Sequence, residues 1–205
     1  MEYKFTSSDF EKAFRFAIEY YLDPTKAPSG RTSAEPRGFG GTLDAFTRGK
    51  LVEIGVQKMM ESFDQNKEMQ LDFAIKNVTE VRPEPDIFKI MEDGRSRDPK
   101  IFIEIKNTGI GDRWIGVTEE QFQSMKEGSA GKEMYTIYAS LTAIGKNNNP
   151  RSADFVGMYL KHISGLDIFE DFSDLDATAK LEFILSTDEL ENFGVRFPAG
   201  DNTYE

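Results

Sequence analysis

The stretch that most constrains the fold of this chain is an apolar run that is interrupted by two charged residues. Residues 101–106 read IFIEIK. Because successive side chains of a strand point to opposite faces, Glu104 and Lys106 must point to the same side. Charged groups in such an apolar strand are costly to bury unless they are paired or bound to a metal ion. The pattern therefore predicts a charged site carried by a buried strand.

Two more strands are expected before this one. Residues 85–91 read PDIFKIM, so Asp86 opens a strand over 87–91, and a charged turn that contains Asp93 and Gly94 follows it. Apolar residues at 71, 73 and 75 alternate, which predicts an earlier strand over about 70–78. Short connections are typical of antiparallel neighbours, so the three strands are predicted to form an antiparallel meander.

Helical periodicity precedes the strands. Residues 9–22 and 43–63 carry apolar residues at helical spacing, and Ser8 with Glu11 matches a capping box at the start of the first helix. The intervening residues 23–42 are rich in Pro and Gly, which predicts a loop. In the second helix, Glu53 falls at the edge of the apolar face. It is an acid at the boundary between core and rim.

The chain after Lys106 predicts a crossover. Thr118 is expected to cap a short helix that ends near Glu127, and a strand is expected from Met134 to Leu141. Because a helix separates this strand from the one ending near residue 107, the two can pair in parallel. A helix over 152–163, a strand over 180–186 and a last short helical turn complete the prediction.

The composition of the chain limits the kinds of catalytic and metal site that it can form. The hydrophobic content of 39% and 17 Phe residues can fill a core, and there is no cysteine and one histidine, His162. Disulfides, thiolate catalysis and Cys- or His-rich metal sites are thereby excluded, so a metal would need oxygen ligands, which favours Mg²⁺. No apolar run is long enough for a membrane span and the start has no signal-peptide pattern. We expect a cytoplasmic protein.

The charge of the chain is unevenly spread. The net charge is −11, which argues against indiscriminate binding to nucleic acid. Residues 165–205 hold eleven acidic and two basic residues, whereas the segment from Lys26 to Lys50 is locally basic. That segment could therefore bind a polyanion although the net charge of the whole chain is negative.

From residue 43 the expected order is helix, strand, strand, strand, helix, strand. With Glu53 in the helix, Pro85-Asp86, and Glu104-Ile105-Lys106 after seventeen intervening residues between the two acids, this order resembles the PD-(D/E)XK nuclease superfamily, best known from type II restriction endonucleases. The resemblance covers residues 43–141. It implies an α/β (α+β) fold with a restriction-endonuclease-like αβββαβ core, in which helices flank a central mixed sheet.

We therefore expect one nuclease domain over residues 1–205. Its core is 43–141, preceded by an N-terminal helix and loop over 1–42 and followed by a C-terminal strand and helix within an acidic segment, 165–205.

The resemblance also assigns roles to residues. Asp86 and Glu104 would hold Mg²⁺, or Mn²⁺ in its place, together with the backbone carbonyl of Ile105. Glu53 would bind through water or hold a second ion, and Lys106 would orient the attacking water or stabilise charge on the phosphate. Glu84 is a reserve acid. The catalytic set is therefore expected to be Glu53, Asp86, Glu104 and Lys106.

The expected substrate is double-stranded DNA. A homodimer would match the two-fold symmetry of a palindromic target, and a cognate DNA methyltransferase could belong to the same system. The candidate DNA contacts are polar or basic residues in loops or near the site: Arg31, Arg37, Arg48, Lys50, Asn107 and Arg113.

Three alternatives remain open. The chain could be the nuclease subunit of a multi-protein defence or repair system that acts on modified or branched DNA. It could be a non-catalytic acidic protein that mimics or binds DNA. It could also be an ordinary α/β domain in which Glu104 and Lys106 form an ion pair at a sheet edge.

Overall fold

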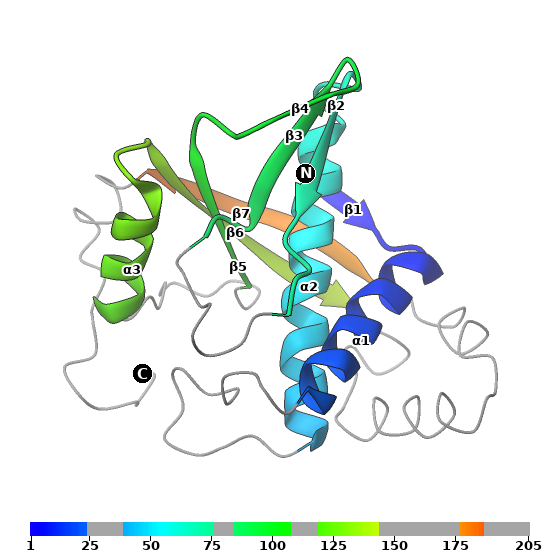
Figure 1. Cartoon of the computed structure of the whole chain (residues 1–205). Coiled ribbons are helices and arrows are strands. Elements are labelled where there is room, and N and C mark those ends of the chain that lie inside the picture. The colour runs from blue at the N-terminus through cyan, green and yellow to red at the C-terminus, as the bar shows by residue number, and fades with distance from the viewer. Residues whose placement is uncertain (24–38, 76–83, 108–118, 144–176, 187–205) are drawn as a thin grey trace.

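The protein has a mixed α+β fold, which confirms the expected class. The computed structural model describes residues 1–23, 39–75, 84–107, 119–143 and 177–186 (Figure 1). Within these ranges the elements are, in chain order, β1 (Glu2–Lys4), α1 (Ser7–Leu22), α2 (Phe39–Glu61), β2 (Lys67–Leu71), β3 (Ile87–Glu92), β4 (Arg95–Arg97), β5 (Phe102–Asn107), α3 (Glu119–Ser129), β6 (Met134–Ala143) and β7 (Thr178–Ser186).

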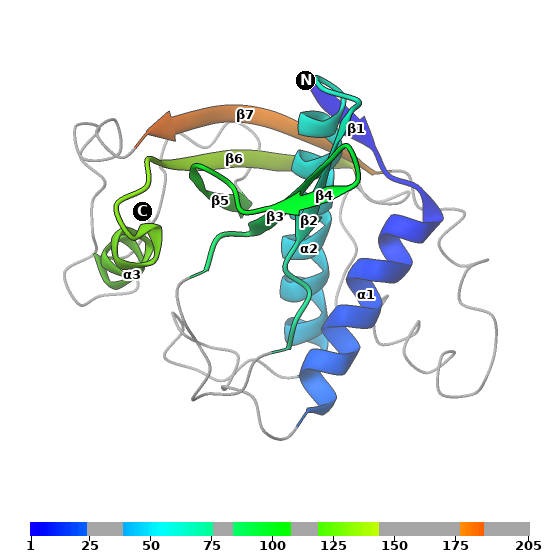
Figure 2. The same ribbon diagram turned by 45° about the horizontal axis from the view of Figure 1, so that its top comes forward.

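The strands form two sheets. The larger has the order β1-β7-β6-β5 and is mixed, because β5 and β6 are parallel whereas the other pairs are antiparallel. Figure 2 shows β7, β6 and β5 side by side, with α2 running across them. The parallel pairing through the crossover helix α3 confirms that prediction, and β7 confirms the expected strand near the C-terminus.

The predicted meander is wrong in its third strand. The smaller sheet has the order β2-β3-β4, and β4 lies inside the segment that was predicted to be a charged turn. Asp93 and Gly94 both have positive φ, 52° and 72°, which is the geometry of a tight two-residue hairpin turn. The chain therefore folds back directly after β3, and β5 joins the other sheet.

The first strand of the smaller sheet is also earlier than predicted. β2 covers Lys67–Leu71 rather than 70–78. Directly after it, the side chain of Asp72 accepts a hydrogen bond from the N–H of Ala74, a local turn that competes with strand pairing. The alternation at 73 and 75 consequently does not continue the strand.

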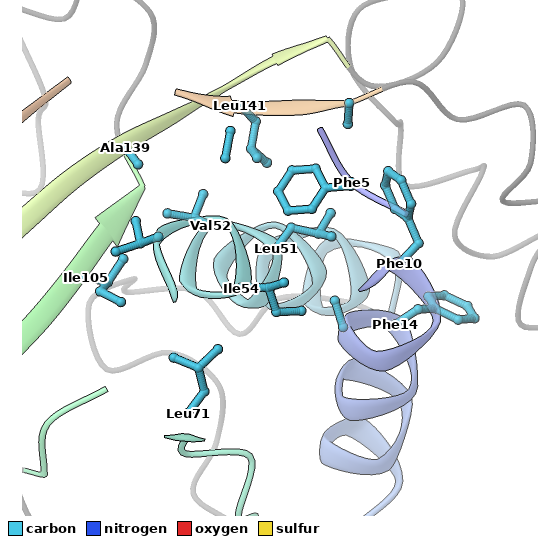
Figure 3. Close-up of a cluster of buried hydrophobic side chains, with 14 of the residues drawn as sticks. Phe5, Phe10, Phe14, Leu51, Val52, Ile54, Leu71, Ile105, Ala139 and Leu141 are labelled. Atoms are coloured by element: carbon cyan, nitrogen blue, oxygen red, sulfur yellow. The ribbon is translucent and has the colours of Figure 1, made fainter. Parts of the chain in front are cut away.

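The long helix α2 is the centre of the core. It begins at Phe39, inside the predicted loop, and its buried residues include Leu51, Val52 and Ile54. Figure 3 shows these side chains between the strands and α1, within one hydrophobic cluster that reaches from Phe5 to Ala179. Phe63, the last residue of the predicted helix over 43–63, lies beyond the end of α2 and is 75% exposed.

A glycine allows α2 to lie close to the sheet. A Cβ atom at Gly55 would be 2.4 Å from Cβ of Ala179 in β7 and 3.3 Å from Cζ of Phe5. No real side chain tolerates the first distance, so only glycine fits without a shift of the backbone. This contact fixes how α2 packs against the sheet.

Helix α1 begins with a capping box, but not the predicted one. Thr6 is the N-cap, and Asp9 accepts hydrogen bonds from the Thr6 N–H and hydroxyl, each at 2.8 Å. The Tyr3 hydroxyl also donates to Asp9, at 2.9 Å. The cap therefore lies two residues before the predicted Ser8–Glu11 pair, and it ties β1 to α1.

Helix α3 lies at the opposite end of the molecule from α1 in both views (Figures 1 and 2). The predicted cap at Thr118, the helix over 152–163 and the last helical turn lie outside the described residues. Of the helices in the described ranges, none has the length and apolar run that crossing a membrane requires.

Candidate acidic site

The acidic site is built where the two sheets touch. Asp86 directly precedes β3, and its backbone N–H donates to the carbonyl of Ile103, at 3.0 Å. Its carboxylate Oδ2 accepts a hydrogen bond from the N–H of Ile105, at 2.6 Å. The acid is thus held against the middle of β5 by backbone groups on both sides of Glu104. This position does not depend on a flexible side-chain partner.

Strand β5 carries the second acid and the lysine. Ile103 and Ile105 are buried in the core, and Glu104 and Lys106 lie on the opposite face, as the alternation predicts. The Lys106 ammonium forms an ion pair with Oε1 of Glu104. The two side chains are 28% and 15% exposed, so the pair lies largely out of solvent.

The third acid comes from α2. The Glu53 side chain is 13% exposed, and its Oε2 lies 2.6 Å from the Nζ of Lys50, one helical turn earlier. The charge of Glu104 raises the pKa of Glu53, and the charges of Glu104 and Glu53 both raise the pKa of Asp86. The structure therefore brings all four predicted catalytic residues into one electrostatic cluster, with Lys50 as a fifth member.

The cluster has one more negative group than positive groups. Burial raises the pKa of the Asp86 carboxyl well above its usual value, and the charges of Glu104 and Glu53 raise it further. Burial also raises the pKa of Glu53, against the influence of Lys50. Burial alone would lower the pKa of Lys106, but the charges of Glu104 and Asp86 outweigh it, so this pKa is raised. The site therefore favours an added positive charge beside Asp86.

The residues that were predicted to contact DNA differ in their exposure and in their partners. Arg48 donates to Asp44 at 2.9 Å, within α2, and Asn107 is exposed at the end of β5. The Lys50 side chain is 11% exposed and pairs with Glu53 inside the protein. A lysine that contacts a DNA phosphate would instead be exposed. Arg31, Arg37 and Arg113 lie outside the described residues. The reserve acid Glu84 is exposed.

Sequence reasoning missed a residue of the neighbouring strand. In the parallel ladder Lys106 is paired with Tyr138, so Tyr138 lies on the Glu104 and Lys106 face of the sheet. Burial and the charge of Glu104 both raise the pKa of the Tyr138 hydroxyl. Its strand was predicted, but the register that places it beside the site cannot be read from hydrophobic alternation alone.

Asp86 and Glu104 are the donors that fit a hard cation. Both are carboxylates, the ligand type that Mg²⁺ takes in ones or twos while keeping several waters. Burial and the charges of Glu104 and Glu53 raise the pKa of Asp86, and a cation beside its carboxylate would act in the opposite direction. Within the described ranges, no three Asp, Glu, His or Cys side chains are grouped so that they could hold a metal ion.

Fold and site together define a mixed α+β protein with a cluster of three carboxylates and two lysines at the junction of two sheets. Comparison of the chain with protein-family models, curated proteins and solved structures found no match.

Proposed function

We propose that the protein is a Mg²⁺-dependent endodeoxyribonuclease that hydrolyses phosphodiester bonds in double-stranded DNA. We further propose that it shares the restriction-endonuclease-like core of the PD-(D/E)XK superfamily and cuts specific sequences as type II enzymes do. The observation that carries the proposal is the position of the Asp86 carboxylate, 2.6 Å from the N–H of Ile105 and therefore beside Glu104 and Lys106.

Each residue has a role that its surroundings support. Asp86 and Glu104 would hold Mg²⁺, or Mn²⁺ in its place, with the carbonyl of Ile105 as a further ligand. Bound Mg²⁺ would lower the pKa of a water molecule and neutralise charge on the phosphate. Lys106, held protonated by its acidic neighbours, would donate hydrogen bonds to the attacking water or to a phosphate oxygen. Glu53, which pairs with Lys50 on α2, would act as a positioning residue for the site.

The direct test is incubation of the purified full chain with phage or plasmid DNA and Mg²⁺, followed by sequencing of the fragment ends. We expect defined fragments, and a loss of cleavage of more than about a hundredfold in Asp86→Asn and in Glu104→Gln. Exposed Glu84→Gln is the matched control and should cut like the unmodified protein. Equal cleavage by Asp86→Asn would overturn the site assignment.

The proposed enzyme acts as a homodimer, because cutting both strands of a two-fold target needs two sites. A cognate DNA methyltransferase would then protect the host's own target sequences. Sedimentation of the full chain with and without a cleaved duplex tests the stoichiometry. One chain bound per duplex would contradict the homodimer.

One observation favours a second candidate. Two of the predicted DNA contacts, Arg48 and Lys50, are engaged by acidic residues of their own helix, and the net charge is −11. A nuclease subunit of a multi-protein defence or repair system could leave DNA binding to its partners and act on modified or branched DNA. Discrete cutting of unmodified plasmid by the chain alone would exclude this candidate.

A further inference from the structure

We infer that the acidic site binds a single divalent ion, because the ammonium of Lys50 occupies the place at Glu53 that a second ion would need. The inference rests on the metal site of the proposed function and goes beyond it by fixing the number of ions. It also gives Lys50 and Glu53 roles that differ from those expected from the sequence.

The contacts of Lys50 carry this inference. Its Nζ lies 2.6 Å from Oε2 of Glu53 and donates a 2.7 Å hydrogen bond to the backbone carbonyl of Asp72. The same Nζ lies 4.8 Å from the ring centroid of Phe16 and 5.0 Å from that of Phe73. One carboxylate, one carbonyl and two ring faces thus surround the ammonium.

These partners come from separate parts of the chain. Phe16 belongs to α1, Lys50 and Glu53 to α2, and Asp72 and Phe73 to the segment after β2. The two rings also pack edge to face, with centroids 5.6 Å apart, so the walls around the ammonium support each other. Because packing of three segments fixes the ammonium, its position does not depend on the surface rotamers of a long side chain.

A fixed ammonium at this point decides what Glu53 can do. A divalent ion bound to Oε2 of Glu53 would have to displace the ammonium or lie beside it, and like charges at such distances repel strongly out of solvent. Glu53 is therefore the counter-charge of Lys50 and a positioning residue for the site. The carboxylates that remain for the ion are Asp86 and Glu104. Lys106 also pairs with Oε1 of Glu104, but its side chain is 28% exposed, against 11% for Lys50, so it has room to turn away when an ion binds.

The test counts ions. The full chain is titrated with Mn²⁺, and the free ion is measured by its electron paramagnetic resonance signal. The blank is Asp86→Asn combined with Glu104→Gln, which removes binding at the site and leaves other surface acids in place. We expect one Mn²⁺ per chain above this blank for the unmodified protein, and two for Lys50→Met, which keeps an apolar stem between the rings.

The matched control is Lys58→Met. Lys58 pairs with Glu61 on the same helix at the same three-residue spacing, at 3.0 Å, but is 41% exposed. This variant should still bind one ion. Glu53→Gln, which keeps a hydrogen-bond acceptor for Lys50, should also bind one ion, with affinity lowered by no more than about 10–100-fold, the range expected for a residue that supports a metal site without binding the ion.

The outcomes separate the two proposals. Two ions in the unmodified protein would overturn the single-ion inference and leave the nuclease proposal standing. One ion in Lys50→Met, or loss of the ion in Glu53→Gln, would likewise overturn the inference alone. Binding of no ion above the blank in the unmodified protein would overturn both.

Discussion

The N–H of Ile105 donates a 2.6 Å hydrogen bond to the carboxylate of Asp86, although Ile105 lies in β5 of the larger sheet and Asp86 directly precedes β3 of the smaller one. Beyond this contact β3 turns toward β2 and β4, whereas β5 pairs with β6. The acid therefore lies in a fork between diverging strands. A fork leaves backbone groups without ladder partners, and here one of them, the N–H of Ile105, holds the carboxylate of Asp86.

The first prediction concerns the burden that Asp86 places on the fold. Asparagine at this position keeps an acceptor for the Ile105 N–H and removes a charge that burial and two acidic neighbours disfavour. We expect Asp86→Asn to raise the free energy of unfolding of the metal-free protein by roughly 1–2 kcal/mol. The unfolding midpoint would rise by about 2–6 °C. Circular dichroism melting in a chelator measures both.

For this prediction, Glu84→Gln is the control, because that acid is exposed and two residues away. Its unfolding midpoint should stay within about 1 °C of the unmodified protein, as for most surface substitutions. A destabilised Asp86→Asn protein would show that the carboxylate contributes more through its hydrogen bond than it loses through burial.

The second prediction concerns the ion pair on β5. Lys106→Met leaves the carboxylate of Glu104 largely buried beside two other acids, and we expect a loss of about 1–3 kcal/mol in the free energy of unfolding. Combining Lys106→Met with Glu104→Gln should restore part of that loss. Urea unfolding of the two single variants and the double variant gives a coupling free energy, expected at about 1–2 kcal/mol. Additive effects would mean that the pair is not formed in solution.

The third prediction tests the close packing of α2 on the sheet. Gly55→Ala places a methyl group against Ala179 and should lower the free energy of unfolding by about 1–2 kcal/mol, since overpacking outweighs the better helix propensity of alanine. Gly49 lies in the same helix with nothing within 4 Å of its added Cβ, so Gly49→Ala should instead raise it by about 0.5–1 kcal/mol.

A compensating change sharpens this test. Ala179→Gly removes the atom that the new methyl group would meet, so the Gly55→Ala and Ala179→Gly double variant should recover part of the loss. If Gly55→Ala stabilises the protein as much as Gly49→Ala does, α2 does not approach β7 as described.

The fourth prediction separates the observed helix cap from the one expected from the sequence. Asp9→Ala removes the acceptor of Tyr3 and Thr6 and should cost about 1–2 kcal/mol of stability. Glu11→Ala removes an ion pair with Arg15, whose side chain is 57% exposed, and should cost less than about 0.5 kcal/mol. Thermal unfolding of both variants decides between the caps, and equal losses would contradict the cap at Thr6.

The sequence predicts where the helices and strands of this fold lie better than it predicts which strands pair. Alternation predicts that Glu104 and Lys106 share one face of their strand, and the structure has Ile103 and Ile105 buried on the other. The crossover at α3 predicts the parallel pairing of β5 with β6. The third strand of the meander was assigned wrongly, although Asp93-Gly94 is a strong signal for a tight hairpin. A three-residue strand such as β4 is too short to produce a periodicity.

The same limit applies to the site. Glu53, Asp86, Glu104 and Lys106 could be selected from the sequence because residue type and position in an element restrict where they lie. Lys50 could not be interpreted correctly, since its partners include a backbone carbonyl 22 residues away and an aromatic ring on another helix. A pattern of residue types does not indicate which distant backbone carbonyl will accept a hydrogen bond from a lysine.

The pairing of β1 with β7 has a consequence for the order in which the molecule assembles. Helices α1 and α2 pack against each other with only the first 61 residues available, but Tyr3 finds its strand partner only at Ala179. Such non-local contacts slow folding, because a long loop must close before they form. During synthesis on the ribosome, β1 must wait for its partner until residues 178–186 have been made. Among the described strand pairs, β1 and β7 are therefore the two that are translated furthest apart in time.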